Sequence, residues 1–217
     1  MILSVLLACS VTHGARPLGK GVVAADLSAG GPVTALFGTN IPLPLSSVGA
    51  AYGVSDTVDL HAAVHTSAAL LFGLPAGEVG ASWAFLLADG ARPRLAIDAT
   101  TVLAGGDIAE GGSPGGFRAL LEPSVLAAWD LGADDRHTVY GGLGAMLQPW
   151  PGPNGYGWLT AGGRWGLGSD ALGLTTEAKW LAPYASNLPM APEMTGVGTL
   201  GALSMQIGLD ARFGGAR

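Results

Sequence analysis

The sequence predicts an all-β protein, an antiparallel up-and-down transmembrane β-barrel of about ten strands, within a range of roughly eight to twelve. Three observations predict it. The composition is too apolar for an ordinary soluble domain, with 12% charged residues and a mean hydropathy of +0.42. A membrane helix needs a run of ~20 apolar residues, and the best runs are interrupted by His65 and by Glu122 and Pro123. Apolar and small or polar residues instead alternate, as in the strands of a membrane barrel.

Length and charge limit the function further. The 217 residues suit a single domain. A net charge of −6 with ten Lys and Arg residues leaves no basic face for nucleic acid. A single cysteine excludes a disulfide scaffold and a cysteine-based metal site. We therefore expect no nucleic-acid partner, no cofactor and no metal.

The N-terminus is a short apolar stretch that ends in Leu6-Leu7-Ala8-Cys9. It resembles the lipobox of a bacterial lipoprotein signal, which implies lipidation at Cys9. The alternative is a chance apolar leader with a buried cysteine. Residues 10–19 contain Gly14, Pro17 and Gly19 and are expected to form a flexible leash. The domain division is therefore 1–19 for the lipoprotein-like remnant and leash, and 20–217 for a single barrel domain.

Dyad alternation recurs from Lys20 to Phe213, interrupted by turn-forming residues. The strands expected from it are Lys20–Ala29, Leu45–Val54, Val58–Phe72, Glu78–Ala88, Arg92–Ala104, Phe117–Leu131, His137–Gln148, Tyr156–Leu167, Ala171–Tyr184 and Val197–Phe213. Most of them reach the ~9–11 residues that a tilted strand needs to cross a bilayer. No helix is expected.

The connections between these strands alternate in length. Long segments, residues 30–44, 105–116, 149–155 and 185–196, follow odd-numbered strands, and residues 73–77 are a short exception. Short turns follow the even-numbered strands. Outer-membrane barrels have short periplasmic turns and longer external loops. We therefore expect the bacterial outer membrane as the location, with both termini in the periplasm, where a lipid on Cys9 would enter the inner leaflet.

The alternation also assigns the two faces of each strand. In the last expected strand Met205, Ile207 and Leu209 share one face, opposite Ser204, Gln206 and Asp210. A soluble lipocalin-like barrel would place the apolar face inside and cover its outside with Lys and Glu. Here the polar face holds mainly Gly, Ala, Ser and Thr, which suits a narrow lumen. The sequence therefore favours apolar residues outside, with the soluble barrel as the alternative.

Two stretches carry a resemblance to outer-membrane β-barrel proteins. Residues 52–60, Tyr-Gly-Val-Ser-Asp-Thr-Val-Asp-Leu, resemble the strand–turn–strand unit of that class. Gln206, Gly208 and Phe213 resemble the C-terminal assembly signal that the barrel-insertion machinery reads. The resemblance implies a membrane barrel with that machinery and membrane lipid as partners. It implies no specific activity, and the oligomeric state stays open.

Aromatic residues near strand ends are expected to form girdles at the two membrane interfaces. Filling of the lumen is the alternative, which we expect for Tyr156 and Trp158. The candidates are Tyr52, Trp83, Trp129, Tyr140, Tyr156, Trp158, Trp165, Trp180 and Tyr184.

Polar residues on the inward face are the candidate functional groups. Asp59, His61, His65 and Ser67 share one face of the third expected strand. His61 or His65 with Ser67 could hydrolyse acyl groups, as in lipid-modifying barrels. Same-face neighbours lie ~6–7 Å apart, so we favour a hydrogen-bonded lumen network over catalysis or metal binding. The rest of this network is expected to include Arg94, Asp98, Arg118, Glu122, Arg164, Glu177, Lys179, Asp210 and Arg212.

A barrel of this size has a lumen that side chains fill. The sequence therefore predicts an outer-membrane barrel (lipo)protein with a structural, interaction or narrow solute-permeation role. The alternatives are an outer-membrane lipid-modifying hydrolase and a soluble lipocalin-like carrier of an apolar ligand.

Overall fold

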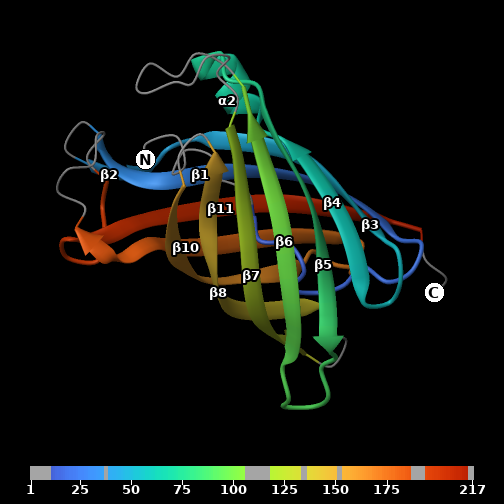
Figure 1. Cartoon of the computed structure of the whole chain (residues 1–217). Helices are drawn as coiled ribbons and strands as arrows, with labels where there is room; N and C mark the ends of the chain where they lie inside the picture. The colour runs from blue at the N-terminus through green and yellow to red at the C-terminus, as the bar shows by residue number, and fades with distance from the viewer. Residues whose placement is uncertain are drawn as a thin grey trace.

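The computed structural model describes residues 11–36, 39–105, 118–132, 136–150, 153–186 and 194–214. Within these ranges ten antiparallel strands close into a barrel, because β1 pairs with β3 on one side and with β11 on the other (Figure 1). The barrel strands are β1 (Val23–Leu36), β3 (Leu45–Gly53), β4 (Val58–Val64), β5 (Ala76–Leu86), β6 (Arg94–Ala104), β7 (Arg118–Leu131), β8 (His137–Trp150), β9 (Asn154–Gly166), β10 (Leu172–Ser186) and β11 (Leu200–Phe213). The predicted fold class is confirmed.

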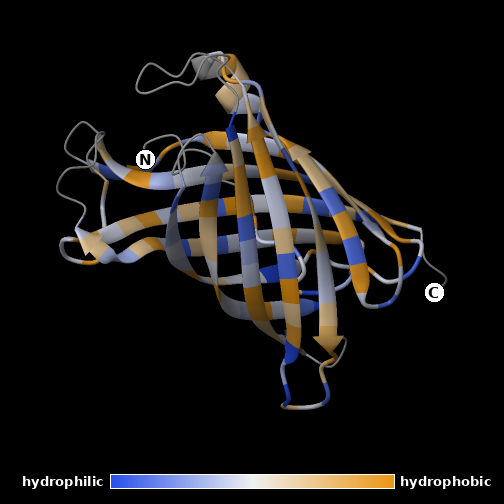
Figure 2. Ribbon diagram, viewed as in Figure 1, coloured by the Kyte–Doolittle hydropathy of each residue, from blue (hydrophilic) through white to orange (hydrophobic). Residues whose placement is uncertain are grey.

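The alternation of each strand places its apolar residues outside. On β11, Met205, Ile207 and Leu209 are 47–51% exposed, whereas Ser204 and Gln206 are buried. Figure 2 shows the same alternation of hydrophobic and hydrophilic residues along the strands. An apolar outer band around a polar lumen is stable in a bilayer and costly in water. The barrel is therefore a transmembrane barrel, and the soluble carrier with an apolar lumen is wrong.

The third expected strand, Val58–Phe72, is wrong in its second half. β4 ends at Val64, and residues Thr66–Phe72 form the helix α2. The run Ala68-Ala69-Leu70 favours a helix, and Gly73 ends it in the left-handed conformation at φ 64°. Figure 1 shows α2 at the opposite end of β5 from the β5–β6 turn. Residues 73–75 therefore belong to a longer connection that includes α2, and residues 76 and 77 begin β5, so this connection is not the short exception that the sequence indicated.

The first long connection also differs from the prediction. Residues 30–36 continue β1, and Val33–Leu36 pair with β2 (Thr39–Pro42) as a hairpin that extends past the barrel end. Gly30 has φ +139°, and a Cβ there would collide with the backbone oxygen of Met205. Gly30-Gly31-Pro32 thus marks a bend inside a strand and not a turn between strands.

An apolar layer fills the lumen at the end that carries α2 and the β1–β2 hairpin. We call this end the loop end and the opposite one the turn end. The layer comes from α2, the segments beside it and the strand ends, and its members are Ala68, Leu74, Ala76, Val102, Ala104, Leu120, Met146, Trp158, Leu181, Met194 and Ala202. Val102 and Leu120 are 0% and 1% exposed. Side chains therefore fill the lumen at the loop end.

The aromatic candidates divide between the two faces. Tyr52, Trp83, Trp129, Trp165 and Tyr184 are exposed on the outside, where girdles form. Trp158 is buried in the lumen, as expected, and Tyr156 packs against the apolar layer. Tyr140 is also buried in the lumen, so its girdle assignment is wrong. Trp180 is half-buried and donates to the carbonyl oxygen of Leu200.

Among the helices of the described residues, none combines the length and the apolar character that crossing a membrane requires.

Candidate functional site

The turn-end half of the lumen holds the chain's own residues 11–19. They enclose, with the barrel wall, a cavity of about 110 Å³ that is lined by His13, Arg16 and Leu18 from the segment and by Asp59, Tyr140 and Arg164 from the wall, among others. Gly14 has φ +83°, and a Cβ there would lie 2.6 Å from Cβ of Ser82 on β5. The segment thus runs against the wall at a point where a side chain has no room. The described part of the expected leash lies inside the barrel.

Three buried charged side chains of the wall bind main-chain atoms of this segment. The amide of Thr12 donates to Oε2 of Glu177 at 3.0 Å. The amide of Leu18 donates to both carboxylate oxygens of Asp59, at 3.0 and 3.3 Å. Nη1 of Arg94 donates to the carbonyl oxygen of Ala15 at 2.9 Å. Hydrogen bonds to charged groups are the strong ones, so the segment is held along most of its length.

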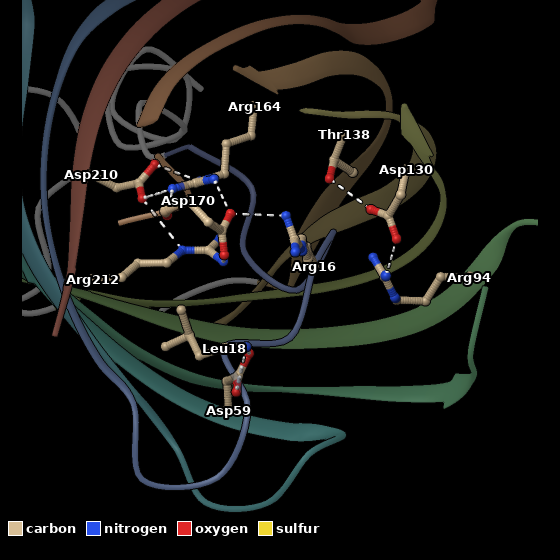
Figure 3. A network of polar contacts seen from close by, with 10 residues as sticks. All are labelled: Arg16, Leu18, Asp59, Arg94, Asp130, Thr138, Arg164, Asp170, Asp210 and Arg212. Carbon is tan, nitrogen blue, oxygen red and sulfur yellow. Dashed lines mark hydrogen bonds and ion pairs between the residues drawn. The ribbon is translucent and has the colours of Figure 1, made fainter. Parts of the chain in front are cut away.

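The wall residues are themselves held in place. Nη2 of Arg94 donates to Asp130 at 2.5 Å, and the hydroxyl of Thr138 donates to the other oxygen of Asp130 (Figure 3). Glu177 accepts the hydroxyl of Tyr140 at 2.5 Å. Because these partners fix the rotamers of Arg94 and Glu177, both side chains are preorganised for the segment.

Glu177 also forms an ion pair with Lys179. Nζ of Lys179 lies 3.3 Å from Oε1 of Glu177 and 5.2 Å from the ring centroid of Trp158. The cation is therefore shared between a carboxylate and an aromatic face, at the boundary between the polar half of the lumen and the apolar layer.

An ionic cluster at the turn end binds the side chain of Arg16. Nη1 of Arg16 lies 3.0 Å from Oδ1 of Asp170. Arg164 donates to both oxygens of Asp210, at 2.7 to 3.1 Å, and to Asp170 at 3.0 Å. Nη1 of Arg212 lies 3.6 Å from Oδ2 of Asp170, and its Nε lies 3.5 Å from Oδ2 of Asp210. Figure 3 shows the arginines of segment and wall converging on Asp170.

His13, His61 and His65 face the lumen, with partners other than Ser67. Nε2 of His61 is 2.9 Å from the hydroxyl of Thr100, which donates to Asp98. The ring of His13 stacks on His61 with centroids 4.1 Å apart. Nε2 of His65 lies 3.3 Å from Oε2 of Glu78.

Ser67 lies on α2 and not on the expected strand face. Its Oγ accepts the amide of Ser46 at 2.7 Å. The Ser–His pairing that hydrolysis would need is therefore not what these residues form: His61 and His65 contact Thr100 and Glu78, while Ser67 contacts the neighbouring strand.

The remaining predicted lumen residues are more dispersed. Asp98 and Glu122 border a small cavity of about 10 Å³, room for about one water molecule. Arg118 begins β7 and is half-buried at the loop end. The described residues contain no group of three or more His, Cys, Asp or Glu side chains placed to hold a metal ion.

Sequence reasoning missed the lumen segment because glycine and proline in residues 11–19 read as a loop. A signal was nevertheless present in the charges. The inward positions carry eight carboxylates, Asp26, Asp59, Glu78, Asp98, Glu122, Asp130, Glu177 and Asp210, and five cations, Arg94, Arg118, Arg164, Lys179 and Arg212. Unpaired charge is costly in a narrow lumen. The excess of carboxylates over cations therefore indicates that further cations or hydrogen-bond donors contact the lumen wall.

The residues predicted for lipidation and for the C-terminal assembly signal have different outcomes. Cys9 lies outside the described residues, so its lipidation stays a prediction. Of the C-terminal motif, Gln206 and Gly208 face the lumen, and Phe213 is 58% exposed at the end of β11, paired with Val23.

The barrel has apolar residues outside and polar residues in its lumen. This arrangement confirms, at the level of the fold, the resemblance to outer-membrane β-barrel proteins. No protein-family model matches the sequence, and no curated protein matches it. Solved structures that are similar include the translocator domain of the autotransporter NalP from Neisseria meningitidis, with 10% identity and a TM-score of 0.42 over 90% of this chain and 89% of that one. The NanC porin has 10% identity and a TM-score of 0.47 over 88% and 98%. The outer membrane protein OprG from Pseudomonas aeruginosa has 10% identity and a TM-score of 0.37 over 93% and 99%.

Proposed function

We propose that this chain is a sealed barrel of the bacterial outer membrane with a structural or interaction role, rather than an open pore. The observation that carries the proposal is the apolar layer across the loop end of the lumen, in which Val102, Leu120, Leu181 and Ala202 are at most 1% exposed. An ion would have to shed its water to cross such a layer, and hydrophobic constrictions close a path by excluding water.

The connections and the ends of β1 and β11 support one orientation in the membrane. β1 begins and β11 ends at the turn end, where Val23 pairs with Phe213. Short turns face the periplasm in outer-membrane barrels. We therefore propose that both termini are periplasmic and that the polar half of the lumen opens toward the periplasm.

Conductance across a planar bilayer tests the seal. The wild-type barrel should show no steady current, because the apolar layer excludes water and ions from the loop end of the lumen. Leu120→Ser should produce intermittent current, since it places a hydroxyl in the layer. Leu121→Ser is the matched control: it lies next on the same strand but faces outward, 40% exposed, and should stay silent.

A second candidate function is narrow permeation of small cations. It is favoured by the acidic middle of the lumen, where Asp98 and Glu122 are 5% and 6% exposed and border the same cavity. A steady, cation-selective wild-type current would overturn the sealed barrel and support this candidate instead.

A further inference from the structure

The contacts of residues 11–19 point to a binding property of the lumen itself. Glu177, Arg94 and Asp59 come from β10, β6 and β4, are 5–8% exposed, and direct their charges at main-chain atoms of residues 12, 15 and 18. Main-chain amides and carbonyls occur in every peptide. A wall that contacts every third residue in this way binds the main chain of the segment, which bends at Ala15 and Arg16, rather than a particular run of side chains.

Side chains of the segment add register to this recognition. Arg16 reaches Asp170 at 3.0 Å, and His13 stacks on His61. Gly14 has no side chain, which lets the main chain pass close to Ser82. Together these contacts fix which residue lies opposite which wall group, while the main-chain bonds supply binding that depends little on sequence.

We propose that the turn-end half of the lumen is a binding site for a short, bent peptide, that residues 11–19 are its resident ligand, and that the site accepts the same peptide as a separate molecule. The proposal deepens the interaction role proposed above. Its test is independent of the seal, because binding is measured in detergent solution without a membrane current.

The experiment keeps the whole chain until it has folded. A site-specific protease sequence is inserted between Gly19 and Lys20, where Lys20 is exposed and a Cβ on Gly19 meets nothing within 4 Å. The folded barrel is cut there. A fluorescent, end-capped peptide with the sequence of residues 11–19 is then added, and anisotropy measures its binding.

The cut barrel should bind one peptide with saturation, in exchange for its own cleaved segment. The uncut barrel should bind none, because its tethered segment competes at an effective concentration of about millimolar. A peptide of the same composition in reversed order should bind more weakly, since Arg16 and Gly14 lose their register.

Amide-to-ester exchange in the peptide isolates the main-chain contacts. Removing the N–H of Thr12 or of Leu18 should weaken binding about ten- to a hundred-fold, the range for hydrogen bonds to charged groups. The same exchange at Ala15, whose carbonyl and not its amide meets the wall, is the matched control and should bind like the parent. Because each change is in the peptide, the barrel is identical in every arm. No saturable binding to the cut barrel, or equal binding by the Leu18 and Ala15 esters, would overturn the proposal.

Discussion

Arg16 and Asp170 are 154 residues apart in the chain, yet their side chains meet at 3.0 Å at the turn end of the barrel. Asp170 lies between β9 and β10, whereas Arg16 lies on the segment that precedes β1. Asp170 also contacts Arg164 and Arg212. The pair therefore links the lumen segment to an ionic cluster that the wall already forms.

Arg164→Ala should lower the free energy of unfolding by about 1–3 kcal/mol, because Asp210 loses its bidentate partner and keeps only Arg212 at 3.5 Å. The side chains of Arg164 and Asp210 are 8% and 15% exposed. Urea titration in phospholipid vesicles measures the change. Arg92→Ala is the control: Arg92 pairs with Asp89 at 3.7 Å and both are exposed, so the loss should stay within about 0.5 kcal/mol. Equal losses would contradict a structural role for the cluster.

Gly14→Ala should loosen the lumen segment, because the new methyl group would collide with Ser82. Gly19→Ala is the matched control: Gly19 also has positive φ, +89°, but a Cβ there meets nothing within 4 Å. Both variants carry the backbone strain of the left-handed region, so their difference measures the steric contact alone. Hydrogen exchange at the amides of Thr12 and Leu18 should accelerate in Gly14→Ala well beyond Gly19→Ala. Similar exchange in both would argue against a tight passage at Ser82.

The fold was predictable because a strand repeats its environment at every second residue. The alternation of Met205, Ile207 and Leu209 with Ser204 and Gln206 fixes which face meets lipid without knowledge of any partner strand. The pattern is less informative where both faces are apolar. Residues 68–72 are of this kind, and there the local preference of Ala and Leu for a helix decided the structure.

The site was only half predictable. The wall residues Asp59, Arg94 and Glu177 follow from strand phase, which assigns them to the lumen. Their partner does not follow, because the contacts of residues 11–19 span up to 165 positions in sequence and involve main-chain atoms that carry no residue signature. The two apolar residues Val102 and Leu120 illustrate another limit: they share the inward phase of polar neighbours and are buried because the loop end of the lumen is closed.

Ile207→Arg should cost about 2–4 kcal/mol of unfolding free energy, because it places a charge on the lipid face near the middle of β11. Val23→Arg should cost at most about 1 kcal/mol, since Val23 lies at the barrel end, opposite Phe213, where water and head groups are within reach. Unfolding by urea in vesicles distinguishes the two positions. In a barrel that lived in water both substitutions would be tolerated alike, so equal effects would contradict the membrane assignment.

Phe213→Ala should slow insertion of the barrel in cells while leaving the stability of the refolded barrel nearly unchanged. Phe213 is 58% exposed, so its removal loses little packing, whereas the C-terminal motif that it closes with Gln206 and Gly208 would lose its aromatic end. Tyr184→Ala is the control, because Tyr184 is 67% exposed but lies on β10, outside this motif. The folded fraction in outer membranes, read from gel mobility without heating, should fall for Phe213→Ala alone. A matching loss in purified refolding would assign the effect to stability and not to the insertion machinery.

Lipidation of Cys9 and occupation of the lumen should exclude each other. Thr12 is bound to Glu177 inside the closed wall. Cys9 is three residues from Thr12, and three residues of extended chain span at most about 11 Å. Acyl chains on Cys9 would therefore reach the periplasmic leaflet only after residues 11–19 have left the lumen. In chains that incorporate labelled palmitate, the amide of Leu18 should therefore exchange its hydrogen rapidly. Cys9→Ser cannot be acylated at this position and should keep that amide protected by Asp59. An acylated chain whose Leu18 amide stays protected would show that anchor and lumen segment coexist.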